Sequence, residues 1–362
     1  MRAAIDATPL LLRSAGVKNY LYHWILTLQK SAGSNRAEPF PMMRDLGTLT
    51  HEASTISGIA TLPRLGFLYF SNLVSGAPLN WLARRADVFH ATNQIRTAVS
   101  GVALTATLHD MTCWVMPEFH TPDNVRADKS FAERTLKRAD GLIAVSEHTR
   151  RDAIEILGLA PEKVTTIHSG VAPEFFETPA EDVREKYRLL KPYVLFVGTL
   201  EPRKNLDRLL EAWSKMRLRK EFDLVVAGPV GWAAPATLAR VNRYARCLGY
   251  VPERDLPSLT YHATIFAYPS LYEGFGFPVA QAMACGVPVL TSNTSCLPEI
   301  SGDGALYVDP KSPAEIRAGL ERLLESEAMR RKLGANGKRL AQRYRWERCA
   351  AESWKFFERV AG

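Results

Sequence analysis

The sequence has 362 residues, is 46% hydrophobic and 23% charged, and carries a formal net charge of +8. This is ordinary globular composition in a chain long enough for two domains, and no run reaches the ~18 uninterrupted apolar residues that a membrane-spanning helix needs. Nucleic acid is not a predicted partner, because no zinc-finger or RNP signature and no long basic arm accompanies the positive charge.

Short apolar runs alternate with amphipathic segments along the whole chain, a pattern typical of parallel sheets with crossover helices. Arg2 and Asp6 interrupt the apolar run at the N-terminus, so we expect no secretory signal there. In the first half, the predicted strands are residues 2–6, 88–91, 104–109, 141–145 and 164–167, and the predicted helices include 16–29, 123–138 and 147–157. Ser146 suits the N-cap of the last of these helices and Gly158 its end.

The second half restarts the same pattern. Its predicted strands are residues 193–197, 223–227, 264–268 and 287–291, and its predicted helices are 205–215, 234–248, 278–285 and 313–325. We therefore predict an α/β protein with doubly wound domains at 1–187 and 188–344, and a C-terminal helix at 345–362 that packs back on the first domain. Ligands of open α/β sheets bind beyond the carboxyl ends of the strands, so the active site is expected in the cleft between the domains.

Lys and Arg balance Asp and Glu over residues 1–187, with 20 of each, so the positive excess lies in residues 188–362. A basic half suits a phosphate-bearing ligand. The five cysteines are scattered and form no CxxC pair, so we expect neither a disulfide framework nor structural zinc, and we expect a cytoplasmic protein.

The most informative segment, residues 268–288, reads as a strand, a glycine-bearing loop and a helix. Gly274 and Gly276 let backbone N–H groups approach a ligand, and the helix N-terminus that follows can bind a diphosphate. Glu273 can face a sugar from this loop, and Gln281 can reach a ribose from the helix. The alternative is a structural joint with a solvated glutamate.

A second loop, residues 197–205, also follows a strand and opens a helix, and it contains Arg203 and Lys204. Two cations at a helix N-terminus oppose the helix dipole, and an anionic ligand would relieve that conflict. Arg203 can bind phosphate as a bidentate fork and Lys204 as a point charge. A solvated basic loop is the alternative.

Two segments of the first half add weaker signals. His109 ends an apolar strand at the expected crevice, where Asp110 beside it can fix its tautomer, although a histidine there is more often structural. Gly16 lies in the turn that opens the first helix and can approach a phosphate or sugar, or it can simply form a turn.

Motifs of other chemistries are absent from the sequence. There is no GxGxxG after the first strand and no GxxxxGK[ST], so nicotinamide and P-loop sites are not predicted. There is no GxSxG elbow. HExxH and DxD are also missing, so we predict no required metal or other cofactor.

Taken together, these segments resemble glycosyltransferase family 4, retaining enzymes of the GT-B fold. The resemblance is ordered and spans most of the chain. It runs through the Gly16 turn, residues 108–110, 143–147, 167–171, 197–206 and 248–252, the Glu273 loop and residues 344–346.

The resemblance implies a retaining hexosyltransferase whose donor is a nucleotide-diphosphate sugar. Glu273 would contact the transferred sugar, Arg203 and Lys204 would neutralise the leaving diphosphate, and His109 would hydrogen-bond the donor sugar. The first domain would hold the acceptor and the second the donor. The donor site implied by the resemblance is completed by Gly16, Val251, Gly274, Phe275, Gly276 and Gln281.

Three positions depart from the family pattern. Gln281 replaces the second glutamate of a pair separated by seven residues, so it can hydrogen-bond a ribose without a charge. Thr199 stands where many relatives carry arginine, which leaves more of the phosphate contact to Arg203. The N-terminal turn reads Ala15-Gly16 in place of two glycines.

Residues 62–85 are apolar and aromatic and end in Arg84 and Arg85. Such a segment can lie on an anionic membrane surface, or it can be a core helix of the first domain. The acceptor is expected to be a glycan or a lipid-linked glycan. Among the possible donors, a nucleotide sugar of the GDP-mannose type is favoured over a UDP-sugar. The competing hypotheses are a sugar-nucleotide epimerase on the same fold and a non-catalytic nucleotide-sugar or glycan binder.

Overall fold

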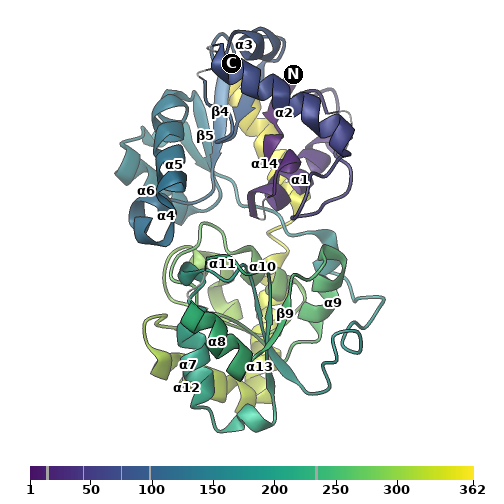
Figure 1. Ribbon diagram of the computed structural model, residues 1–362, viewed down its shortest axis with the longest axis vertical. Coiled ribbons are helices and arrows are strands. Elements are labelled where there is room, and N and C mark those ends of the chain that lie inside the picture. The colour runs from purple at the N-terminus through teal and green to yellow at the C-terminus, as the bar shows by residue number, and fades with distance from the viewer. Residues whose placement is uncertain (14–15, 44, 75, 98, 233–234) are drawn as a thin grey trace. The chain divides into compact units, whose positions relative to one another are not determined.

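The computed structural model describes residues 1–13, 16–43, 45–74, 76–97, 99–232 and 235–362. The chain divides into two compact units: Met1–Gly170 with Trp346–Gly362, and Val171–Arg345. Each unit contains a six-stranded sheet in which every pairing of neighbouring strands is parallel (Figure 1). The predicted fold class, two doubly wound α/β domains, is confirmed.

The first unit has the strand order β2-β1-β3-β4-β5-β6, which reverses direction between β1 and β3. Crossover helices connect the strands, and the central strands β3 and β5 are buried along their whole length. Its elements are β1 (Arg2–Asp6), α1 (Gly16–Lys30), β2 (Arg36–Phe40), α2 (Gly58–Leu73), α3 (Ala77–Ala83), β3 (Val88–Ala91), β4 (Ala103–Leu108), α4 (Thr112–Val115), α5 (Pro122–Arg134), β5 (Gly141–Ala144), α6 (Glu147–Leu157), β6 (Val164–Thr166) and α14 (Trp346–Ala361).

The second unit has the order β12-β11-β10-β7-β8-β9, which reverses between β7 and β10. Its elements are β7 (Tyr193–Val197), α7 (Leu206–Ser214), β8 (Asp223–Ala227), α8 (Pro235–Tyr244), β9 (Arg246–Gly249), α9 (Leu256–Tyr261), β10 (Ile265–Tyr268), α10 (Phe277–Ala284), β11 (Val289–Ser292), α11 (Leu297–Ser301), β12 (Ala305–Val308), α12 (Pro313–Glu325) and α13 (Glu327–Ala341).

The helix predicted over residues 234–248 is wrong at its C-terminal end. The structure ends α8 at Tyr244 and makes Arg246–Gly249 the edge strand β9, which pairs with β8. The predicted caps of α6 are confirmed, because Ser146 Oγ accepts a hydrogen bond from Thr149 N at 3.0 Å and Gly158 adopts φ +64°.

The C-terminal helix α14 belongs to the first unit, where it lies alongside α1 (Figure 1). Trp24 Nε1 on α1 donates to Ser353 Oγ on α14 at 3.0 Å. Trp354 and Phe357 of α14 are buried, and the Phe357 ring lies 6.0 Å from the Trp24 ring. The helix therefore completes the core of the first unit although it follows the second unit in sequence.

Candidate active site

Two loops of the second unit leave the carboxyl ends of β7 and β10, which pair with each other at the point where the strand order reverses. Open α/β sheets bind their ligands at such a point, because the loops that leave the two strands diverge there. The loop after β7 contains the short 3₁₀ helix Pro202–Lys204. The loop after β10 contains Glu273, so fold topology brings the two predicted sequence signals together.

Arg203, Lys204 and Glu273 form one buried ion-pair cluster with Glu201. Lys204 Nζ lies 2.7 Å from Glu273 Oε1, and Arg203 Nη1 lies 3.1 Å from Glu273 Oε2. Arg203 Nη2 also contacts Glu201 Oε1 at 2.7 Å. The four side chains are between 7% and 13% exposed. Their cations are therefore shielded from solvent and offset by carboxylates.

The Glu273 carboxylate is ionised despite its burial. Burial by itself raises its pKa, but the charges of Lys204 and Arg203 and hydrogen bonds from Lys204 and Ser270 lower the pKa to about 2. Ser270 Oγ donates to Glu273 Oε1 at 2.7 Å, and the Tyr268 hydroxyl donates to the same oxygen at 3.1 Å. Glu273 thus presents a fixed negative charge at neutral pH.

Asn205 holds the two loops in this arrangement. Its backbone adopts the left-handed conformation (φ +60°), which asparagine tolerates better than most residues. Its side-chain Nδ2 donates to Pro269 O at 2.8 Å and to Pro310 O at 2.6 Å. Leu271 N donates to Arg203 O at 2.9 Å. The cations are consequently positioned by the backbone as well as by their ion pairs.

Helix α10 begins directly after the Glu273 loop. Gly276 is its N-cap with φ +80°, a left-handed conformation that favours glycine. Gly274 and Phe275 are buried in the same loop. Gln281 is half-buried in α10, and Val251 is buried after β9. Within the described residues, no hydrogen bond or ion pair joins Gln281 or Val251 to the cluster.

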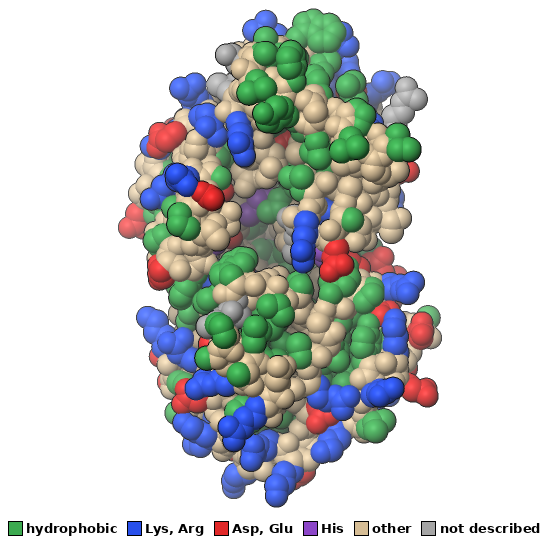
Figure 2. All heavy atoms as spheres, viewed as in Figure 1, with side chains coloured by type: hydrophobic (Ala, Val, Ile, Leu, Met, Phe, Trp, Pro, Cys, Tyr) green, Lys and Arg blue, Asp and Glu red, His purple; other side chains and the backbone are tan. Residues whose placement is uncertain are grey.

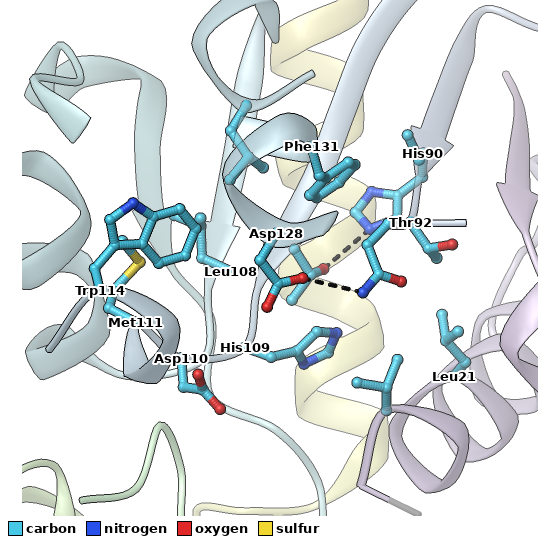
Figure 3. Close-up of a pocket in the computed structure, with 15 residues that line it drawn as sticks. Leu21, His90, Thr92, Leu108, His109, Asp110, Met111, Trp114, Asp128 and Phe131 are labelled. Atoms are coloured by element: carbon cyan, nitrogen blue, oxygen red, sulfur yellow. Dashed lines mark hydrogen bonds between the residues drawn. The ribbon is translucent and has the colours of Figure 1, made fainter. Parts of the chain in front are cut away.

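His109 lies in the first unit, where it lines a cavity of about 150 Å³ beside the ends of β3 and β4 (Figure 3). The imidazole is half-buried and packs edge-on against Tyr20, with 4.9 Å between ring centroids. Burial lowers its pKa to about 4, although the neighbouring Asp110 carboxylate acts in the opposite direction. His109 is therefore neutral at pH 7 and can act as a hydrogen-bonding group.

The same cavity is bordered by a second histidine, His90. Its Nδ1 and Nε2 each lie 3.0 Å from a threonine hydroxyl, those of Thr105 and Thr107 respectively. The pKa of His90 is lowered to about 3, mainly by burial and in smaller part by repulsion from a charged His109. Because the pKa values of both imidazoles lie well below 7, both rings are neutral at pH 7 and add no positive charge to the cavity.

Gly16 is the first residue of α1, and a Cβ there would meet nothing within 4 Å. The preceding Ser14 and Ala15, which belong to the predicted turn, lie outside the described residues. In the parts of the chain that the structure describes, no group of three or more His, Cys, Asp or Glu side chains could hold a metal ion. The candidate site residues therefore fall into two sets, one in each unit.

Comparison with known proteins matches each half of the chain to a glycosyltransferase family. The family described as Glycosyltransferase Family 4 matches residues 43–175, and the family described as Glycosyl transferases group 1 matches residues 180–340. The O-antigen chain mannosyltransferase B of Escherichia coli is 34% identical over 276 residues, which cover 73% of this chain and 71% of that protein.

Solved structures share the fold of the whole chain. Sucrose-phosphate synthase from Thermosynechococcus elongatus has a TM-score of 0.74 at 18% identity, with 99% of this chain and 98% of that chain covered. HepE from Anabaena, solved in complex with UDP and glucose, has a TM-score of 0.72 at 18% identity, with 99% and 100% covered. The likeness establishes the two-domain GT-B fold.

Proposed function

The chain belongs to glycosyltransferase family 4 and is a hexosyltransferase, and from this premise we propose that it transfers mannose with retention from GDP-mannose to a growing glycan. The observation that carries the proposal is the buried pair Arg203 and Lys204, held at the strand-order reversal where a diphosphate can replace Glu273 as their anionic partner. The mannosyl donor is supported by the similarity to the E. coli O-antigen mannosyltransferase. Family membership sets aside the epimerase and non-catalytic hypotheses.

In this proposal the bond between C1 of the sugar and the diphosphate breaks, and the acceptor hydroxyl oxygen bonds to C1 on the same face. The departing phosphate takes the acceptor's proton. Arg203 and Lys204 stabilise the negative charge that develops on the leaving group. Glu273 orients the sugar hydroxyls as a fixed hydrogen-bond acceptor, and neutral His109 hydrogen-bonds the donor sugar. In this proposal Val251, Gly274, Phe275, Gly276, Gln281 and Gly16 complete the set of residues that contact the donor.

The donor is tested by thermal unfolding of the protein with GDP, GDP-mannose, UDP and UDP-glucose. A ligand at 100 times its Kd stabilises the folded state by about 2.7 kcal/mol, so we expect GDP compounds to raise Tm and UDP compounds to raise it less. A larger shift with UDP would reassign the base. A protein that responds to none of the four nucleotides at millimolar concentration would contradict the proposal. The anomeric configuration of the product, read by NMR, tests retention.

We also propose that this enzyme works in the cytoplasm and meets a lipid-linked acceptor at the membrane surface through α2 and α3. Residues 58–86 contain Arg64, Arg84 and Arg85 but no Asp or Glu. Large apolar side chains gather over these helices (Figure 2), and the exposed ones, with exposed fractions between 55% and 88%, are Ile59, Leu62, Tyr69, Phe70, Leu73 and Trp81. No helix within the described residues has both the length and the hydrophobicity to cross a bilayer.

This surface combines the two properties that bind a protein to an anionic bilayer, namely apolar side chains and positive charge. We expect co-sedimentation with vesicles containing 30% phosphatidylglycerol, and at least a tenfold lower bound fraction for the Tyr69→Ser, Phe70→Ser, Leu73→Ser triple variant. Ile156→Ser removes an exposed apolar side chain from α6 and serves as the control. Equal sedimentation of the wild type and the triple variant would refute membrane contact through α2.

A further inference from the structure

The cavity of the first unit is lined by carboxylates that have no role in the proposed binding of the donor. Besides His109, it is lined by the carboxylates of Asp110 and Asp128, and no Lys or Arg is among the described residues that line it. Because both histidines are neutral at pH 7, the lining is negatively charged. A neutral, hydroxyl-rich ligand suits such a cavity, and an anionic ligand does not.

Asp128 is the carboxylate placed to bind such a ligand. It lies on α5, where its Oδ2 accepts a hydrogen bond from Cys113 Sγ at 2.9 Å and its Oδ1 accepts one from Asn93 Nδ2 at 3.3 Å. Burial, followed by the contact with Asp128, raises the pKa of the Cys113 thiol far above its usual value, so the thiol keeps its proton and donates. The two contacts fix the carboxylate plane, and each oxygen retains a lone pair for another donor.

Asp110 has a different role. Its Oδ1 accepts from both Thr112 N at 2.9 Å and Thr112 Oγ1 at 2.5 Å, which commits that oxygen to the start of α4. In Figure 3 the Asp128 carboxylate points toward the His109 imidazole. Its two contacts leave both oxygens able to accept another hydrogen bond, so Asp128 is the acidic group available to a ligand in the space beside His109.

We propose that Asp128 selects the acceptor by accepting hydrogen bonds from two adjacent hydroxyls of a neutral terminal sugar, and that the negative lining excludes acceptor termini bearing phosphate or carboxylate. This inference rests on the proposed transferase function, and it defines the acceptor class of the same site. A carboxylate with two oriented oxygens matches a vicinal diol, because it can accept one hydrogen bond at each oxygen. A negatively charged lining repels an anionic ligand, because bringing like charges together at a binding surface costs free energy.

The test compares α-linked mannotriose with the same trisaccharide phosphorylated at its terminal 6-hydroxyl. For the wild type we expect kcat/KM to be at least 30-fold higher with the neutral trisaccharide. Asp128→Asn keeps the shape of the side chain and removes its charge. We expect this variant to raise the acceptor KM at least tenfold and to leave the donor KM within twofold. The ratio of kcat/KM between the neutral and the phosphorylated trisaccharide should fall at least fivefold. Asp123→Asn, on the exposed face of the same helix, is the matched control and should leave every value within twofold.

Several results would overturn the inference: equal use of both trisaccharides by the wild type, an unchanged acceptor KM in Asp128→Asn, or a donor KM that rises together with the acceptor KM. If Asp128→Asn does not fold, the inference is tested by the wild type's ratio of kcat/KM for the neutral and the phosphorylated trisaccharide. Calorimetric titration of the wild type with the two trisaccharides, in the presence of GDP, reads the cavity without catalysis. Absence of transfer from any nucleotide sugar would refute the proposed function, whereas calorimetry showing equal affinities would refute the role of the cavity.

Discussion

Lys204→Ala is expected to lower kcat/KM for hexose transfer by a factor of about 10²–10³, in line with the loss of a single preorganised group that stabilises a leaving group. The Lys204 side chain is 12% exposed and its Nζ lies 2.7 Å from a buried carboxylate. A charge in this shielded position interacts with a diphosphate more strongly than an exposed lysine does. Alanine supplies neither a charge nor a hydrogen bond, so the variant should bind the donor more weakly and stabilise the negative charge of the leaving diphosphate less.

The measurement pairs steady-state kinetics with nucleotide-induced Tm shifts. Lys215→Ala is the matched control, because Lys215 also pairs with a glutamate, Glu211 at 2.8 Å, but is 60% exposed. We expect Lys215→Ala to behave as the wild type and Lys204→Ala to lose most of its Tm shift with GDP. Circular dichroism at the assay temperature establishes that both variants are folded. Wild-type kinetics in a folded Lys204→Ala variant would show that the diphosphate binds elsewhere.

Sequence periodicity predicts the central strands of both sheets but misses three strands, β2, β9 and β12, all of which lie at sheet edges. Central strands are buried on both faces and read as continuous apolar runs. An edge strand does not need an apolar side chain at every position. Strand β2 is Arg-Ala-Glu-Pro-Phe, and β9 is largely exposed with an arginine at its start. Their strand conformation comes from pairing with a neighbour, which local sequence does not encode.

The candidate site divides in the same way. Arg203, Lys204 and Glu273 stand in loops whose glycines, prolines and flanking strands are visible in the sequence, and the sheet topology brings them within hydrogen-bond distance. Glu201 and Asp128 were missed. Asp128 stands on a polar amphipathic helix where nothing local distinguishes it from a solvated residue, and its position depends on Cys113 and Asn93 from separate segments. A contact of that kind is fixed by tertiary structure.

Glu273→Gln is expected to separate nucleotide binding from catalysis. In the ligand-free protein Glu273 neutralises both Arg203 and Lys204, so an incoming diphosphate must compete with it. Glutamine keeps the size and removes the competing charge. We therefore expect the Kd for GDP to fall about tenfold, the effect of ~1.4 kcal/mol. In the same variant kcat should fall about 10²-fold, because the sugar hydroxyls lose the carboxylate that accepts their hydrogen bonds and the diphosphate product dissociates more slowly.

The sign of the binding change is the decisive feature, since Lys204→Ala and Glu273→Gln should move GDP affinity in opposite directions. Asp255→Asn is the matched control: Asp255 is 6% exposed and pairs with Lys186 at 2.5 Å, away from the cluster. Because the pKa of Glu273 is about 2, it stays ionised through the pH range of an assay, and the affinity gain should be the same at pH 6 and pH 8. Weaker GDP binding by a folded Glu273→Gln variant would mean that Glu273 supports the nucleotide instead of competing with it, and the assigned division between phosphate-binding and sugar-binding residues would be wrong.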